Sequence, residues 1–190
     1  APTQGATLTP AEQQAVQDYR GYEFRDINAA LRQGHPPDTE IVTTSGAAKS
    51  LDEITGPLDG AIDRARATQA RTVYRGKTLA PGEPVPQVGQ VIRDPAYLST
   101  STDPNVITQQ GSEYVSPFRR SGTSADAPGT PVVYDITVPQ GSAALDVPGS
   151  SEAEVLLPRN TALRVTNVAT DPATGRVRVG AEVVPDRGAA

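Results

Sequence analysis

The sequence contains no cysteine, which excludes disulfide bonds, thiolate nucleophiles and cysteine-bound zinc. It also contains a single histidine, His35, which lies in the proline-rich segment "GHPPD". One histidine supplies too little material for a histidine-based triad or metal cluster, and in such a loop a solvated side chain is the expected state. Any catalysis must therefore depend on carboxylates, arginines and hydroxyl groups.

Long apolar runs are also missing. No stretch approaches the roughly 20 apolar residues of a membrane-spanning helix, and the opening "APTQGATLTP" lacks the apolar core of a signal peptide. We therefore expect a soluble chain with no membrane span, either mature or cut from a longer precursor. Basic blocks are absent as well, since 17 lysines and arginines stand against 22 aspartates and glutamates, so no binding of nucleic acid is expected.

Aromatic residues are few, with six tyrosines and two phenylalanines, whereas glycine (17) and proline (18) are abundant. This composition favours turns and strands over a helical bundle. The length of 190 residues fits one domain with a hydrophobic core of its own. We therefore predict a single monomeric domain over residues 1–190, with a helical part at about 8–70 and a β core at about 71–185.

The first 70 residues have the pattern of helices. Thr9 is an N-cap with a proline directly after it and Glu12 three residues on, which is a capping box. The helical stretch over residues 10–32 can break at Gly21 and ends before the glycine and prolines of "GHPPD". A second helix is predicted to begin at Ser50, and "LDGAIDRARAT" predicts a third.

From Thr72 onward the sequence changes to short β-branched or apolar runs separated by glycine, proline and aspartate, which is typical of strands. Residues 103–130 are predicted to begin with a short helix and to continue as a long loop, and a loop of that length is usually functional or disordered. Helices followed by strands predict an α+β fold. The predicted strands are "TVYRG", "AYLSTS", "PVVYDITV", "AEVLL", "ALRVTNVA" and "RVRVGAEVV", the last two forming a hairpin around "TDPATG".

Two nucleotide-binding motifs fail on inspection. The segment "RTVYRGKT" ends like a phosphate-binding P-loop, but Arg71 stands where that loop needs a glycine. No G-x-G-x-x-G opens a helix after a strand, so the dinucleotide fingerprint of a Rossmann domain is missing too. Neither motif predicts a function for this chain.

The segment "SSEAEVLL" places Glu152 and Glu154 one residue apart at the start of an apolar strand. Side chains alternate between faces along a strand, so the two carboxylates are predicted to project to one side while Val155 and the leucines after it enter the core. One interpretation is a pair of solvent-facing charges that protect an edge strand. The other is a catalytic pair that stabilises a cationic transition state and handles a proton, with repulsion raising one pKa.

Two further signals precede the glutamates in the chain. Arg75, in "TVYRGK", is either a surface charge or a planar fork for a phosphate or carboxylate. The segment "YLSTSTD" places Ser99 and Ser101 on one face of a strand end, which alone is an ordinary polar strand end. The ordered set of aromatic-Arg, Ser-Thr-Ser and Glu-x-Glu is far less expected by chance than any one member.

This ordered set resembles the mono-ADP-ribosyltransferases of the Arg, Ser-Thr-Ser, Glu-x-Glu class, the group that includes the clostridial binary toxins and the C3-like exoenzymes. The likeness covers nearly the whole chain. "TLTPAEQQAVQDYRGYEFRDINAALR" resembles the helical opening of the family, and "VYRG", "YLSTST", "VVYDITVPQGSAAL" and "SEAEVLLPRNTALRV" resemble its successive β elements. The resemblance implies N-terminal helices followed by a mixed or antiparallel β core of two sheets.

The resemblance also implies that NAD is the co-substrate, without a metal, and that its ADP-ribose passes to a protein side chain. Glu154 would bond a hydroxyl of the nicotinamide-side ribose and stabilise the oxocarbenium-like transition state. Arg75 would hold an NAD phosphate, and Ser99 would hold Glu154 in place. The other residues expected around NAD are Gly76, Thr100, Ser101, Tyr19, Phe24 and Asn28, together with Phe118, Arg119 and Arg120 from "SPFRR".

Glu152 implies the acceptor, because in this family a glutamate at the first position goes with arginine targets. A guanidinium stays protonated up to a pKa above about 12, so a carboxylate must orient it and take a proton. We therefore expect a secreted bacterial toxin or effector that modifies an arginine of a protein inside a target cell, actin being one candidate. Two alternatives are an NAD glycohydrolase, with water as acceptor, and a catalytically silent binding domain of the same fold.

Overall fold

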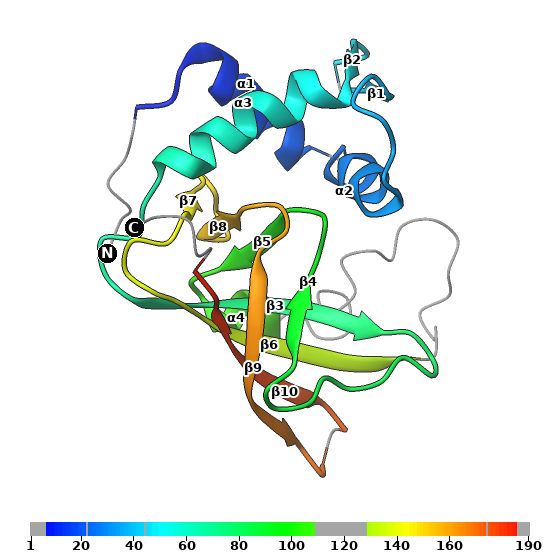
Figure 1. Cartoon of the computed structure of the whole chain (residues 1–190), viewed down its shortest axis with the longest axis vertical. Helices are drawn as coiled ribbons and strands as arrows, with labels where there is room; N and C mark the ends of the chain where they lie inside the picture. Colours follow the sequence, from blue (N-terminus) through cyan, green and yellow to red (C-terminus); the bar gives the residue numbers. More distant parts are fainter. Residues whose placement is uncertain (1–6, 22, 44, 109–128, 174, 186–190) are drawn as a thin grey trace.

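The structure is a computed structural model that describes residues 7–21, 23–43, 45–108, 129–173 and 175–185. A helical layer lies over one end of a large sheet, and the first part of the chain forms that layer (Figure 1). No helix in the described ranges is long and apolar enough to cross a membrane. The elements of the helical layer are α1 (Pro10–Arg20), α2 (Phe24–Gln33), β1 (Glu40–Val42), β2 (Ala48–Ser50) and α3 (Leu51–Arg64).

The second part of the chain forms an eight-stranded sheet in the order β4-β9-β10-β6-β3-β5-β8-β7. The β6 and β10 strands run parallel, and the other neighbours pair antiparallel, so the sheet is mixed. Its elements are β3 (Arg71–Leu79), β4 (Val91–Arg93), β5 (Leu98–Ser101), β6 (Thr130–Val138), β7 (Leu145–Asp146), β8 (Glu154–Leu157), β9 (Ala162–Thr170) and β10 (Val177–Val183), with the short helix α4 (Pro104–Thr108) after β5.

The predicted α+β fold is confirmed, and the two expected sheets are joined into one. The five strands from β4 to β3 meet the three strands β5, β8 and β7 through a single residue pair, Tyr74 with Ser101. The sheet can bend at this narrow connection because a single pair constrains its twist weakly. The strand that carries Ser-Thr-Ser therefore lies at the junction of the two parts.

The β8 strand is buried on both faces, which explains its unbroken apolar run. Leu156 packs in the core beneath the helices, whereas Val155 and Leu157 pack in the core between the strands, and all three are 0% exposed. A strand covered on both sides has no need for alternating polar residues. The apolar end of "SSEAEVLL" enters the core, as predicted.

Several local predictions are confirmed. Thr9 caps α1 with the expected capping box, and Gly34 ends α2 in the left-handed conformation at φ 67°. The predicted hairpin is formed by β9 and β10, and α4 is the short helix expected after the Ser-Thr-Ser strand. Capping and turn chemistry act within a few residues, so such features can be read directly from the sequence.

The prediction of two separate helices after Ser50 is wrong, because α3 continues through Pro57 as one helix. Its buried positions are Leu51, Ile54, Thr55, Leu58, Ala61 and Ile62, a spacing of three and four residues that passes the proline without interruption. Packing of this stripe outweighs the backbone hydrogen bond that a proline removes.

Helices also do not fill the whole of the first 70 residues, since β1 and β2 form a small antiparallel hairpin there. The two strands are three residues long each, too short for an alternating pattern to be recognised. Ser50 ends β2 and is at the same time the N-cap of α3. The hairpin therefore leads directly into the helix.

Glu12 ties α1 to α3 and is expected to contribute strongly to stability. Its carboxylate accepts bonds from Arg64 at 2.6 and 2.7 Å and from the backbone N–H of Thr9 at 2.8 Å. The hydrogen bond from Arg64 lowers the pKa of Glu12 from 4.5 to about 2. Glu12→Gln is expected to lower the free energy of unfolding by about 2 kcal/mol at pH 7, because charge-assisted bonds are lost.

The sign of the pH dependence follows from the lowered pKa. The contribution of Glu12 is complete above its unfolded-state pKa of 4.5 and is lost as the pH falls toward about 2. Urea unfolding at pH 7 and pH 3 measures both effects. Asp63→Asn is a matched control, because Asp63 is 77% exposed in its pair with Arg66. Equal midpoints for Glu12→Gln and this control would contradict the prediction.

Candidate active site

The Ser-Thr-Ser strand and the glutamate strand are neighbours in the sheet, which brings their polar side chains together. Ser101 pairs with Glu154 across the β5 and β8 strands, so Ser99 lies on the same face two residues along. The hydroxyl of Ser99 donates to Oε1 of Glu154 at 2.5 Å. The side chain of Glu154 is 14% exposed. The predicted contact between Ser99 and Glu154 is therefore present.

Glu152 does not lie on the strand, so the predicted placement of both glutamates by strand alternation is wrong. The β8 strand begins at Glu154, Glu152 lies in the turn before it, and Ala153 between them has φ 48°. A left-handed residue interrupts the two-residue alternation of a strand. Ser101 and Ser150 hold this turn.

The turn that carries Glu152 is fixed by serine hydroxyls. Ser101 Oγ donates to the carbonyl oxygen of Glu152 at 2.6 Å. Ser150 Oγ accepts the backbone N–H groups of Glu152 at 3.2 Å and Glu154 at 3.4 Å. These bonds offset the cost of the left-handed Ala153 and hold Glu152 close to the start of β8.

The charge state of Glu154 is set by opposing effects. Burial raises the pKa of its carboxyl, and the negative charge of Glu152 raises it further. The hydrogen bond from Ser99 and the positive charge of Arg20 act in the opposite direction, and the net result is a raised pKa. A carboxylate with a raised pKa beside a second carboxylate is typical of a site that handles charge or protons.

Thr100 and Ser101 use their hydroxyls on the main chain of the glutamate strand and turn. Thr100 Oγ1 donates to the carbonyl oxygen of Val155 at 2.7 Å, and Ser101 bonds Glu152 as described above. Both side chains are buried. They fix the position of β8 against β5, and through it the position of Glu154.

A pocket of about 370 Å³ lies beside these strands, with Arg75 in its wall. Arg75 comes from β3, and its Nη1 donates to the carbonyl oxygen of Ser99 at 2.9 Å. It has no ion-pair partner among the residues that the structure describes, and burial lowers its pKa. The pocket is lined by Arg32, Arg75, Lys77, Thr78, Ile92, Asp94, Leu98, Tyr134, Thr161 and Leu163.

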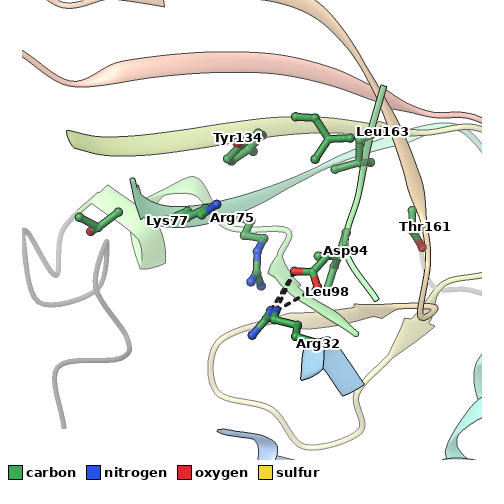
Figure 2. Close-up of a pocket in the computed structure, with 10 residues that line it drawn as sticks. Arg32, Arg75, Lys77, Asp94, Leu98, Tyr134, Thr161 and Leu163 are labelled. Atoms are coloured by element: carbon green, nitrogen blue, oxygen red, sulfur yellow. Dashed lines mark hydrogen bonds and ion pairs between the residues drawn. The ribbon is translucent and has the colours of Figure 1, made fainter. Parts of the chain in front are cut away.

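Arg32 is a pocket residue that the sequence did not indicate. Figure 2 shows the guanidinium groups of Arg32 and Arg75 directed toward the same space, with Asp94 beside them. Arg32 binds Asp94 through two nitrogens, Nε at 3.0 Å and Nη2 at 2.8 Å. Burial raises the pKa of Asp94, but the bonds from Arg32 and from the backbone of Ala96 outweigh it and lower the pKa overall.

Lys77 adds a third cation to the pocket wall, and it is paired with Glu83 at 2.6 Å. Neither Glu154 nor Gly76 lines the pocket. Arg75 connects the two places, because it lines the pocket and bonds the backbone of Ser99, whose side chain bonds Glu154. The cationic pocket and the carboxylate therefore adjoin at β5.

Tyr19 and Asn28 are buried and contact Tyr97, the residue directly before β5. Asn28 Nδ2 donates to the hydroxyl of Tyr19 at 2.9 Å, and Asn28 Oδ1 accepts the backbone N–H of Tyr97 at 3.3 Å. Tyr19 is 2% exposed and its ring meets that of Tyr97 edge-on at 5.3 Å. Burial raises the pKa of Tyr19 to about 12. Phe24 packs against the same core, 6.3 Å from the Tyr19 ring.

A second group of contacts fixes the start of β5. The hydroxyl of Tyr97 donates to Asp59 on α3 at 2.5 Å, and Arg159 binds the same carboxylate through two nitrogens. Tyr97 is 0% exposed. The helical layer therefore holds the chain directly before β5 in place, which restricts the movement of Ser99 and of Glu154 bonded to it.

Phe118, Arg119 and Arg120 lie outside the described residues, so their expected place around NAD stays a prediction. In the described part of the chain, no three histidine or acidic side chains gather into a group that could hold a metal ion.

A mixed sheet with helices over one end, and with an arginine, a Ser-Thr-Ser segment and a partly buried glutamate on neighbouring strands, is the architecture of an ADP-ribosyltransferase. Solved structures share this fold. The transferase Vis from Vibrio splendidus, solved in complex with agmatine, has a TM-score of 0.67 at 23% identity, over 97% of this chain and 79% of that one. Exoenzyme S from Pseudomonas aeruginosa, solved with human 14-3-3 protein beta and carba-NAD, has a TM-score of 0.65 at 24% identity, over 96% and 79%.

The chain belongs to the family of ADP-ribosyltransferase exoenzymes, whose family model matches residues 3–184. Exoenzyme T of Pseudomonas aeruginosa is 30% identical over 165 residues, which cover 85% of this chain and 30% of that protein. The NAD(+)--arginine ADP-ribosyltransferase of Enterobacteria phage T4 is 27% identical over 186 residues, covering 84% and 26%. The chain thus spans less than a third of each relative, and the resemblance seen in the sequence is confirmed. Enzymes of this family use NAD as co-substrate.

Proposed function

We propose that this chain cleaves the nicotinamide–ribose bond of NAD and transfers ADP-ribose to the guanidinium group of an arginine in a target protein. The observation that carries the proposal is the bond from Ser99 to the partly buried Glu154 beside a pocket whose wall contains Arg75. An anionic dinucleotide and a developing ribose cation need these two kinds of group next to each other. Family membership supplies the reaction class.

The pocket supplies the cationic contacts for NAD. Arg75 and Arg32 direct their guanidinium groups into one space, and a guanidinium fork suits the oxygens of a pyrophosphate. Asp94 holds Arg32 through two bonds, so the fork is oriented before NAD arrives. The apolar wall contributed by Ile92, Leu98 and Leu163 offers contact to the rest of the dinucleotide.

The chemistry at Glu154 is charge stabilisation. The bond from ribose C1′ to the nicotinamide nitrogen breaks, nicotinamide leaves with the bonding electrons, and the ribose becomes an oxocarbenium-like cation. Glu154 accepts a hydrogen bond from a hydroxyl of this ribose and places its negative charge beside the cation. The hydrogen bond from Ser99 holds the carboxylate in position. The low exposure of Glu154 strengthens this interaction.

Glu152 orients the acceptor. An arginine nitrogen attacks C1′, a C–N bond forms, and the proton that the guanidinium releases passes to the carboxylate of Glu152. Two comparisons support an arginine acceptor: the phage relative is named for arginine, and Vis was solved with agmatine, which carries a guanidino group. Relatives named exoenzymes support secretion of this chain and action on a protein of another cell.

A direct assay with a small acceptor tests the proposal. The purified chain is incubated with NAD and agmatine. Nicotinamide release is followed by chromatography, and the mass of the agmatine product is measured by mass spectrometry. We expect ADP-ribosylated agmatine to form in step with nicotinamide. Release of nicotinamide with free ADP-ribose as the only other product would instead identify an NAD glycohydrolase. If no nicotinamide is released from this mixture, the proposal is refuted.

Arg75→Lys tests the phosphate role in the same assay. Lysine keeps the charge but loses the planar fork, so we expect KM for NAD to rise by about tenfold, with kcat changed much less. Arg178→Lys is the matched control, because the side chain of Arg178 is 60% exposed and pairs with Asp135 away from the pocket. An unchanged KM in Arg75→Lys would exclude Arg75 from phosphate binding.

A further inference from the structure

The side chain of Arg20 is a cation that lies beside the carboxylate of Glu154. The proposed reaction gives Arg20 no role. It is the last residue of α1, and its side chain leaves the helix toward the turn that precedes β8. Its Nε lies 4.0 Å from Oε2 of Glu154, and its Nη1 donates to the carbonyl oxygen of Pro148 at 3.2 Å. One side chain therefore contacts both the carboxylate and the turn that carries Glu152.

The two oxygens of Glu154 have different neighbours. Oε1 accepts the hydroxyl of Ser99 at 2.5 Å, whereas Oε2 faces the guanidinium of Arg20. A carboxylate held at one oxygen can still rotate about its last torsion, which is broad. A cation beside the second oxygen restricts that rotation, so Ser99 and Arg20 together define the plane of the carboxylate.

The turn at residues 147–153 is likewise held from two sides. On the sheet side, Ser101 donates to the carbonyl oxygen of Glu152. On the helix side, Arg20 donates to the carbonyl oxygen of Pro148. Through Arg20, α1 therefore contacts both the carboxylate of Glu154 and the turn that carries Glu152. We propose that Arg20 is a positioning residue that holds Glu154 and the turn of Glu152 in the geometry required for transfer, an inference that rests on the proposed function.

Electrostatics give Arg20 a second effect that a purely structural residue lacks. The groups that face Glu154 are Ser99 from β5, Arg20 and Tyr19 from α1, and Glu152 from the turn. Burial and Glu152 raise the pKa of Glu154, while Ser99 and Arg20 lower it. Arg20 is thus the positive charge that opposes the burial of a carboxylate which must be ionised to stabilise a cation.

The test compares Arg20→Gln, Arg20→Lys and the control Arg66→Gln, whose arginine is 50% exposed in a surface pair with Asp63. The first readout is the pH dependence of nicotinamide release. Loss of the positive charge raises the pKa of Glu154, so the acidic limb of the rate profile should move to higher pH in Arg20→Gln. Its kcat at pH 7 should fall by about tenfold, because the carboxylate of Glu154 and the turn that carries Glu152 lose a contact that holds them. In Arg20→Lys the acidic limb should return toward its wild-type position, and the profile of Arg66→Gln should match that of the wild type.

A second readout does not depend on activity. Carbon-13 NMR of labelled glutamate carboxyls, with the Glu154 signal assigned from Glu154→Gln, follows the titration of Glu154 directly in the wild type and in Arg20→Gln. An upward shift supports the proposal. A titration and an acidic limb that coincide with the wild type, whether or not kcat falls, would overturn it. A wild type that leaves NAD intact would refute the proposed function, and the NMR titration would still decide the role of Arg20.

Discussion

Glu154→Gln is expected to lower the rate of nicotinamide release by about 1,000-fold, because the transition-state cation loses the negative charge placed beside it. The substitution preserves shape and can still accept the hydroxyl of Ser99 on its amide oxygen. Binding of NAD through Arg75 and the pocket should persist, so the loss should fall on kcat with little change in KM. Single-turnover release of nicotinamide measures the chemical step directly.

Two comparisons make this expectation specific to Glu154. Glu182→Gln removes an exposed carboxylate of β10 and should leave the rate unchanged. Ser99→Ala leaves the charge of Glu154 but removes its hydrogen bond, so a smaller loss, about tenfold, is expected. Circular dichroism and urea unfolding establish that the variants are folded. Nicotinamide release at the wild-type rate in Glu154→Gln would remove this carboxylate from the mechanism.

The contact between Ser99 and Glu154 was expected from the resemblance to the ADP-ribosyltransferase family, because nothing within either strand indicates which strand lies beside it. The burial of the apolar run after Glu154 could be predicted from the sequence itself, since the run lies within one short strand. The same holds for the cap at Thr9 and the hairpin of β9 and β10, which depend on a few neighbouring residues. Local rules were sufficient for these features.

Arg32 and Asp94 could not be predicted in the same way. They are 62 residues apart in the chain and meet only because α2 packs over the segment between β4 and β5. In the sequence Arg32 is an ordinary basic residue in the last turn of a helix, where a cation favours the helix dipole in any case. Arg20 at the end of α1 is hidden by the same ordinary explanation.

The position of Glu152 was predicted wrongly for a different reason. A left-handed residue is usually a glycine or asparagine, and the sequence at this point has Ala153. The conformation is imposed by the hydroxyls of Ser101 and Ser150, one of which comes from a strand about 50 residues earlier in the chain. Tertiary contacts of this kind leave no local signal. They separate Glu152 from the strand and place it in the turn.

That separation strengthens the expectation that the two glutamates perform different steps. Glu154 lies on β8, is 14% exposed and is bonded to Ser99, whereas Glu152 lies outside the strand, in the turn that precedes it. Glu152→Gln should therefore largely spare hydrolysis of NAD. It should lower transfer to agmatine by about 100-fold or more, because a neutral amide cannot take the proton of the guanidinium.

Measuring both products from one reaction makes the ratio of transfer to hydrolysis the decisive quantity. In the wild type, ADP-ribosylagmatine should exceed free ADP-ribose, and in Glu152→Gln the order should reverse while total nicotinamide release stays within about threefold. Glu152→Asp is the informative companion, since it keeps the base but shortens its reach and should lose less transfer than the glutamine variant. An equal fall in transfer and hydrolysis would place Glu152 in the cleavage step with Glu154, and a wild-type ratio would mean that the acceptor is activated by another group.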